Sequence, residues 1–224
     1  MNILQEIENF INEFNQSHDE EFAIDSIRVE FSKQHKLERL KALGEWKKIN
    51  ANDKKIMSKL KKRLTADEVT TAYQLEKENI YYYNSSTPPK YRKATLVIFG
   101  MKQYHKEPPK RDFVIKLLTI IKGVSNIDIC LDMAHRPNIE ALSRYFTLKP
   151  YITHSGVITD TYYINHPEIN MIEKIVIYNK AFKNSLEGVL WRIEAKVLIP
   201  NIRYLALPLY EFKEFTDLAR EQND

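Results

Sequence analysis

The sequence has a single cysteine and no long apolar segment, and both absences narrow the class of protein. With Cys130 alone, the chain forms no disulfide framework and no cysteine-rich zinc site. No apolar run reaches the roughly 18 residues that a membrane span requires. The N-terminal stretch MNILQEIENF is acidic and lacks the basic segment of a signal peptide. We therefore expect a cytoplasmic protein with no membrane partner, in which Cys130 is a small buried side chain.

The net charge of +4 is unevenly distributed along the chain. Acidic residues dominate positions 1–31, whereas lysine and arginine dominate positions 32–63. Such a basic block is typical of a surface that contacts phosphates, although a solvated helical face is the alternative. The candidate nucleic-acid contacts are Lys33, Lys36, Arg39, Lys47, Lys48, Lys54, Lys55, Lys59, Lys61, Lys62 and Arg63.

Apolar periodicity predicts the elements of the N-terminal half. Residues 3–16 carry apolar side chains at helical spacing. Residues 22–31 alternate as a strand does, with Asp25 as an exception on the apolar face. A helical interpretation of this short stretch stays open. The remaining predictions are basic helices over 32–49 and 53–64, a helix start at 65–68 and a loop at 84–89.

The C-terminal half is richer in strands. Residues 94–99, ATLVIF, form a continuous apolar run that is typical of a buried central strand. A helix is predicted over 111–122, where Gly123 ends it. Further strands are predicted over 126–133, 151–165 (with a turn near 154–156), 172–180 and 189–199, and helices over 137–146 and 210–222.

This order of elements predicts an α+β fold with a mainly antiparallel central sheet and helices packed on one face. The similar stretches IDSIRVEF and IDICLDM each follow a predicted helix and suggest two related halves. We divide the chain into an N-terminal helical extension at 1–20, an α+β domain at 21–205 that includes the basic helices of 32–64, and a C-terminal helix at 206–224.

Charged residues share one face of the predicted strand that contains GVLWRIEAKV. Apolar side chains occupy every second position from Trp191, while Arg192, Glu194 and Lys196 lie on the opposite face. A row of charges on a strand face is unusual for plain solvated surface. This pattern indicates a functional site.

Two other predicted strands also present polar faces. One carries Asp128 and Asp132, although aspartate is depleted in strands. The other carries Tyr178 and Lys180. Carboxylate oxygens are natural ligands of Mg²⁺ or Mn²⁺, which would neutralise a phosphate that a tyrosine attacks. The alternative is a lattice of salt bridges across an exposed sheet.

Five short motifs follow one another between roughly residues 22 and 200. They are IDSIRVEF at 24–31, NIDICLD at 126–132, TYYIN at 161–165, IYNK at 177–180 and WRIE at 191–194. In this order they resemble the motifs of plasmid- and phage-type rolling-circle replication initiators, the Rep_trans group, which nick DNA at a double-strand origin. Two departures from the family's pattern are Asn126, in place of arginine, and Asn165-His166, in place of Gly-Ser.

The resemblance implies a DNA-nicking enzyme that forms a 5′-phosphotyrosyl link and leaves a free 3′-OH for a polymerase. The residues it implies are Tyr178 as nucleophile, Lys180, Arg192 and Lys196 beside the scissile phosphate, and Asp128, Asp132 and Glu194 around Mg²⁺ or Mn²⁺. The partners it implies are a double-strand origin, the single-stranded nick region, a second copy of the chain and a host helicase.

Other interpretations stay open. Tyr162, Tyr163 and the cluster at 81–83 compete with Tyr178 for the nucleophile's role. The E-x-K pattern that starts at Glu194 is typical of metal-dependent nucleases that use water, although Asp132 lies far from it in sequence for such a fold. The basic block alone is consistent with a DNA-binding protein without catalysis. No His-hydrophobic-His pair occurs, so we do not expect the histidine-paired metal site of other rolling-circle nucleases.

Overall fold

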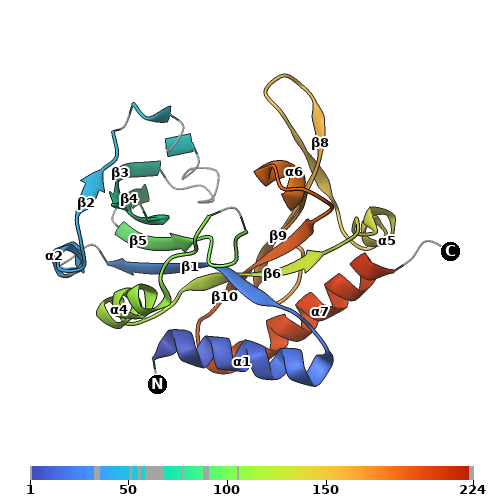
Figure 1. Ribbon diagram of the computed structural model, residues 1–224, viewed down its shortest axis with the longest axis horizontal. Coiled ribbons are helices and arrows are strands. Elements are labelled where there is room, and N and C mark those ends of the chain that lie inside the picture. Colours follow the sequence, from blue (N-terminus) through green and yellow to red (C-terminus); the bar gives the residue numbers. More distant parts are fainter. Residues whose placement is uncertain are drawn as a thin grey trace. The chain divides into compact units, whose positions relative to one another are not determined.

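Figure 1 shows the computed structural model of the chain. The structure describes residues 2–32, 36–50, 52–54, 57–58, 68–76, 78–87, 91–104 and 106–221. The chain forms two compact units. Unit 1 comprises residues 1–4, 26–101 and 107–125, and unit 2 comprises residues 5–25, 102–106 and 126–224.

Unit 1 contains a run of antiparallel strands. Their order is β2 (Trp46–Lys48), β3 (Glu68–Leu75), β4 (Ile80–Thr87), β5 (Tyr91–Phe99) and β1 (Ala23–Ser32), whose first residues belong to unit 2. Two helices of this unit whose bounds the structure gives are α2 (Lys36–Lys41) and α4 (Arg111–Ile121). Tyr81 and Tyr83 of β4 pack with Val97 and Phe99 of β5 in a buried cluster. Tyr81 and Tyr83 are therefore part of a core, and Tyr82 between them is also buried.

Unit 2 contains the strands that carry the predicted site. Their antiparallel order is β6 (Asn126–Met133), β10 (Trp191–Leu198), β9 (Ile172–Asn179), β8 (Ile158–Asn165) and β7 (Lys149–Ile152). Its helices are α1 (Ile3–His18), whose first residues belong to unit 1, α5 (Ile139–Ser143), α6 (Lys180–Asn184), the 3₁₀ helix η1 (Ile202–Tyr204) and α7 (Ala206–Arg220). The neighbouring positions of β6, β10 and β9 are what assemble the site.

The apolar faces of β6 and β10 form much of the core of unit 2. Ile129, Ile193 and Ala195 are fully buried, as their alternation with polar residues predicts. The amphipathic helices α1 and α7 meet through Phe14 and Tyr210, whose ring centroids are 5.0 Å apart. Both helices run along one side of the unit 2 strands (Figure 1). The candidate site lies on the opposite, charged faces of β6 and β10.

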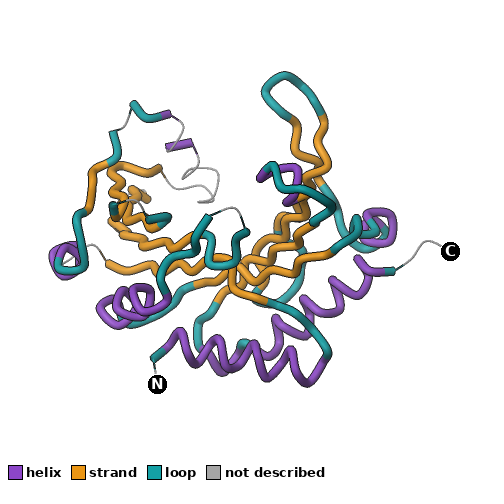
Figure 2. The backbone as a smooth tube through the Cα atoms, in the orientation of Figure 1, coloured by secondary structure: helices purple, strands orange, loops and turns teal. Residues whose placement is uncertain are grey.

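The predicted α+β class and the mainly antiparallel pairing are confirmed, as the arrangement of helices and strands in Figure 2 shows. The bounds predicted for β6 are confirmed, and the predicted turn near 154–156 joins β7 to β8. Cys130 is buried, as expected. Within the described residues, no helix combines the length and the apolar character that a bilayer crossing needs.

The predicted helix over 32–49 is wrong in its second half. Helix α2 ends at Lys41, and the next residues turn through Gly44 into β2, which pairs with β3. Gly44 has a φ of 155°, and a Cβ there would meet Leu75 Cδ1 at 3.0 Å. The pairing of β2 with β3, which follows later in the chain, overrides the local helical pattern. The residues of β2 alone give no information about that partner.

The predicted helix start at 65–68 and the predicted loop at 84–89 are wrong where the structure describes them. Glu68 begins strand β3, and residues 84–87 continue β4 opposite residues 91–94 of β5. The polar residues 84–87 are held in the sheet by backbone hydrogen bonds to β5. Their amino-acid composition does not show this pairing. Of the predicted helix over 53–64, residues 54 and 57–58 are helical. Positions 55–56, 59–67 and 88–90 lie outside the described residues.

Candidate active site

Strands β6, β10 and β9 bring the predicted site residues onto one sheet face. The pairing registers form three rows across the strands: Asp132–Arg192–Tyr178, Cys130–Glu194–Val176 and Asp128–Lys196–Lys174. Residues two apart on one strand share a face, so neighbouring rows stack along the strands. The sequence-predicted residues of three separate motifs therefore form one cluster in unit 2.

Arg192 lies at the centre of this cluster, with a fully buried side chain. Its Nε and Nη2 donate to the two carboxylate oxygens of Asp132 at 2.5 and 2.7 Å. Its Nη1 donates to Asp25 Oδ1 at 2.6 Å and to the Lys102 carbonyl oxygen at 2.9 Å, and lies 3.8 Å from Glu194 Oε1. Burial opposes the charged form of Arg192, but the hydrogen bonds with Asp132 outweigh it and raise the pKa of the guanidinium.

Asp25 belongs to the site, although its role was not predicted. It reaches Arg192 from β1, and its side chain is 15% exposed. Burial and then the negative charge of Glu194 raise the pKa of Asp25 to about 7, against the opposing charge of Arg192. The signal in the sequence was its position on the apolar face of a strand, where an aspartate needs a buried partner.

Tyr178 is in direct contact with Glu194. Its hydroxyl donates to Glu194 Oε1 at 2.5 Å, shorter than a normal hydrogen bond. The tyrosine is 5% exposed, and Lys183 Nζ lies 4.0 Å from its ring centroid. Burial, and then the negative charge of Glu194, raise the pKa of Tyr178 well above its ordinary value. At neutral pH the phenol is therefore protonated, and its proton is directed at Glu194 Oε1.

Lys180 and Tyr104 border the cluster next to Asp132. Lys180 begins α6 instead of ending β9, and its Nζ donates to the Lys102 carbonyl oxygen at 2.9 Å. Burial and the charge of Arg192 lower the pKa of Lys180. Tyr104 donates to Asp132 Oδ2 at 2.7 Å, and burial together with this hydrogen bond raises the pKa of Tyr104 to about 12. Sequence reasoning missed Lys102 and Tyr104, because no periodic pattern marks their loop.

The predicted metal ligands are Asp128, Asp132 and Glu194. Asp132 accepts hydrogen bonds on both oxygens from Arg192, and one of these oxygens also accepts from Tyr104. Burial would raise the pKa of Asp132, but the hydrogen bonds and charge of Arg192 outweigh it and lower that pKa. Across the part of the chain that the structure describes, no three histidine, cysteine or acidic side chains are arranged to hold a metal ion. The cluster is centred on a guanidinium, and its carboxyl groups do not form a preformed metal site. Binding of Mg²⁺ or Mn²⁺ by these residues stays a prediction.

Two predicted phosphate contacts have carboxylate partners. Arg192 has no exposed side-chain surface, and its donors face acidic groups and a carbonyl. Lys196 Nζ pairs with Glu173 Oε2 at 2.6 Å and is 16% exposed. In this structure both cations hold the site's own anions. A contact with phosphate would require those partners to move, and it stays a prediction.

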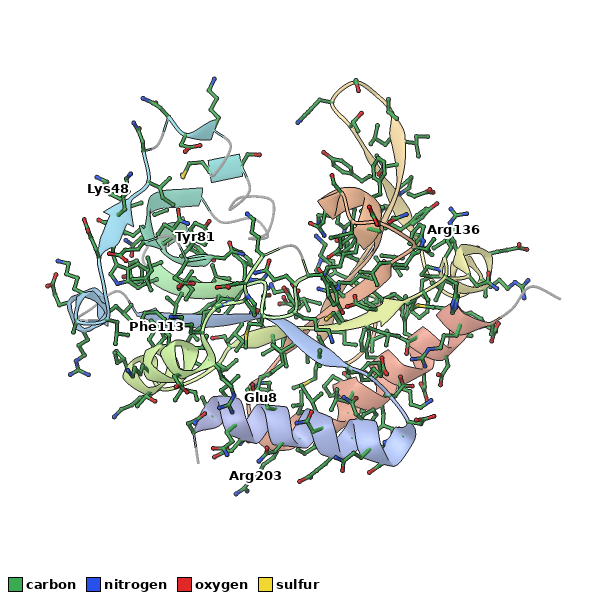
Figure 3. All side chains as sticks on the ribbon, viewed as in Figure 1. Glu8, Lys48, Tyr81, Phe113, Arg136 and Arg203 are labelled. Atoms are coloured by element: carbon green, nitrogen blue, oxygen red, sulfur yellow. The ribbon has the colours of Figure 1, made fainter. Side chains whose placement is uncertain are left out.

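The rival tyrosines of β8 have other surroundings. Tyr163 lies in the row of Glu194, beyond Val176, and its ring centroid is 4.5 Å from Lys174 Nζ. The Tyr162 hydroxyl is 3.2 Å from Arg136 Nη2 (Arg136 is labelled in Figure 3). Tyr163 therefore remains the nearer rival of Tyr178, since it shares the site's face.

The basic block lies in unit 1, where four of its predicted contacts are exposed. These are Arg39, Lys47, Lys48 and Lys54. Lys48 extends from β2 in Figure 3. Lys36 is in α2. The predicted contacts at Lys33, Lys55, Lys59, Lys61, Lys62 and Arg63 lie outside the described residues.

The chain is thus an α+β protein with a guanidinium-centred carboxylate cluster beside a buried tyrosine. No family model matches the chain, and no curated protein matches it. Among solved structures, it is similar to a rolling circle replication initiator protein from Geobacillus stearothermophilus, with 13% sequence identity and a TM-score of 0.41. The match covers 88% of this chain and 79% of that chain. At this TM-score, function has to be argued from the site residues themselves.

Proposed function

We propose that the chain nicks one strand of DNA at a replication origin, with Tyr178 as nucleophile and Glu194 as its base. The supporting observation is the 2.5 Å hydrogen bond from the Tyr178 hydroxyl to Glu194 Oε1. Because the pKa of Tyr178 is raised, the phenol must give up its proton as it attacks. A carboxylate already in contact with that proton is the acceptor that general base catalysis needs. The ordered motifs IYNK and WRIE contain this pair of residues.

The proposed reaction is a transesterification at a phosphodiester. The Tyr178 oxygen forms a bond to phosphorus, the bond from phosphorus to O3′ breaks, and the phenolic proton passes to Glu194. Lys180 supplies the proton that completes the 3′-OH, because its lowered pKa makes it a stronger acid than an ordinary lysine. The products are a 5′-phosphotyrosyl link and a free 3′-OH. Since Tyr178 is 5% exposed, the side chains that cover it must move before a DNA strand can reach its hydroxyl.

A covalent adduct is the decisive test. We would incubate the chain with labelled single-stranded DNA of randomised sequence, in Mn²⁺ and separately in a chelator, and look for protein–DNA adducts that survive denaturation. The adduct is expected on Tyr178, absent in Tyr178→Phe and retained in Tyr163→Phe. The comparison of Mn²⁺ with the chelator tests the metal prediction separately.

Two other results would replace this proposal. Cleavage without any adduct would support a metal-dependent nuclease that uses water. Salt-dependent binding with no cleavage would support a non-catalytic DNA-binding protein. Recovery of the cleaved sequences would show whether they define an origin. The homodimer and the host helicase stay predicted partners.

A further inference from the structure

Phe182 is exposed to solvent in helix α6, four residues after the candidate nucleophile Tyr178. Helix α6 follows directly on β9, which carries Tyr178. The exposed fraction of Phe182 is 86%, the largest among the exposed large hydrophobic side chains of the described residues. A single exposed apolar side chain is common on protein surfaces. The case for a function of Phe182 rests on the hydrogen bonds that hold its backbone and on the residues around it.

The backbone that carries Phe182 is held on both sides. Its N–H donates to Asn179 Oδ1 at 2.9 Å, and its carbonyl oxygen accepts from the Ser185 N–H at 3.4 Å. The start of α6 is tied to the chain just before β10, because the Lys180 N–H donates to the Leu190 carbonyl oxygen at 2.7 Å. The aromatic ring is thus presented to solvent from a backbone that is hydrogen-bonded to the strands of the site.

The surroundings of Phe182 favour a polyanion. Lys183 follows it in sequence, with its Nζ 4.0 Å from the Tyr178 ring centroid. Lys180, two residues before Phe182, is buried, and its Nζ donates to the Lys102 carbonyl oxygen. Helix α6 therefore carries an uncovered aromatic ring next in sequence to a lysine whose ammonium group reaches the Tyr178 ring, while the Tyr178 hydroxyl itself is held by Glu194. Proteins that bind single-stranded nucleic acid combine positive charge for the backbone with exposed aromatic rings on which bases stack.

We propose that Phe182 is a stacking site for an unpaired base next to the phosphate at Tyr178, so that the site selects single-stranded DNA. The position of that phosphate rests on the proposed function, whereas the base contact itself requires only single-stranded DNA. In a duplex, each base face is covered by its neighbours. A flat exposed ring therefore discriminates between unpaired and paired DNA by what it can stack on.

The test is a binding measurement in the Tyr178→Phe chain, in which no adduct at Tyr178 can form. Fluorescence anisotropy is recorded with a labelled single strand and with the matching duplex. Phe182→Ala is expected to weaken single-strand binding by about 5- to 150-fold, the range for losing one stacked base. Phe182→Trp is expected to retain it. Tyr204→Ala, which removes a 63% exposed ring from η1, is the matched control and is expected to leave binding unchanged.

Unchanged single-strand affinity in Phe182→Ala would overturn the stacking site, as would an equal loss with the duplex. The latter result would indicate a general contact with DNA. Failure of the nicking proposal is distinguishable from failure of this one. If Phe182→Ala weakens binding while the wild-type chain forms no adduct, the stacking site stands without the nicking reaction. If adducts form on Tyr178 and Phe182→Ala binds normally, the nicking reaction stands without the stacking site.

Discussion

Arg192 and Asp132 form a two-pronged ion pair across neighbouring strands, Nε to Oδ1 at 2.5 Å and Nη2 to Oδ2 at 2.7 Å. Their side chains are 0% and 13% exposed, so water contributes little to either charge. Asp25 and Glu194 complete a shell of carboxyl groups around the same guanidinium. The charged face of β10 is therefore a buried network whose members depend on one another for charge compensation.

Arg192→Met should test this dependence, because it removes the cation and keeps a long side chain. We expect the free energy of unfolding to fall by about 3–5 kcal/mol, since buried carboxylates lose their partner. Urea unfolding followed by circular dichroism measures it. Arg144→Met is the matched control, because Arg144 pairs at 3.7 Å with Glu140 and both are well exposed. Its expected cost is about 0–1 kcal/mol. Equal costs for the two variants would contradict a stabilising network.

Glu194→Gln should separate proton transfer from binding. Glutamine keeps the shape of the side chain but is a far weaker base, so adduct formation is expected to slow by about 10²- to 10⁴-fold. Single-strand affinity should stay near that of the wild type. Quenched-flow sampling of the adduct measures the rate. Glu187→Gln, at an exposed position before β10, is the control and should leave the rate near wild type. A normal rate in Glu194→Gln would remove Glu194 as the base.

Asp25 predicts a pH dependence of stability. Its pKa is about 7 in the folded chain against an ordinary value of 3.8, so between these values the folded state binds more protons than the unfolded state. The stability that this group contributes is present below the ordinary pKa and is lost as the pH rises through the folded pKa. The stability of wild type relative to Asp25→Asn should therefore fall from about pH 4 to about pH 8. Melting temperatures of both proteins across that range measure it, and a flat difference would contradict the raised pKa.

Alternation along single strands was enough to predict the face of most site residues. A period of two decides which side chains share a face, and it placed Arg192 and Glu194 of β10 together, as the structure confirms. It could not predict that Tyr178 lies opposite Arg192, because strand order and register depend on pairing between distant segments. The resemblance to known motifs grouped these strands, but it did not supply their contacts.

The sequence pattern could not predict which group each charged side chain of the site contacts. Arg192 was predicted to face a phosphate, yet its donors face Asp132 and Asp25, because charge is visible in a sequence and burial is not. Tyr104 enters the site from a loop without periodicity, so no local signal marked it. Asp25 had a signal, an aspartate on an apolar strand face, but its partner is far away in sequence.

Lys47 and Lys48 of β2 allow a test of the basic block. Both are exposed, and if each contacts one phosphate, replacing both by alanine should lower the salt slope of duplex binding by about 1.8, that is about 0.9 per contact. Binding titrations at several salt concentrations measure the slope. The matched control is Lys110→Ala with Lys122→Ala, which removes the same charge from exposed positions flanking α4. An equal change in the control would indicate a general effect of net charge.

Glu20 connects the chain just after α1 to helix α7 in unit 2. Its side chain is 1% exposed, and Arg220 Nη1 and Nη2 donate to its two oxygens at 2.9 and 2.6 Å. Lys213 Nζ lies 3.6 Å from the same carboxylate. The hydrogen bonds with Glu20 raise the pKa of Arg220. This buried anion, with two cations that are more exposed, predicts an asymmetric response to substitution.

A double-mutant cycle with Glu20→Ala and Arg220→Ala measures the coupling through urea unfolding. We expect Arg220→Ala to cost more than Glu20→Ala, because it leaves a buried carboxylate with only Lys213, whereas Glu20→Ala leaves cations that reach water. The expected coupling is about 1–3 kcal/mol. Glu21→Ala removes the same charge from an exposed neighbour and should change stability by less than about 0.5 kcal/mol. A coupling near zero would show that α7 is held by its apolar side chains alone.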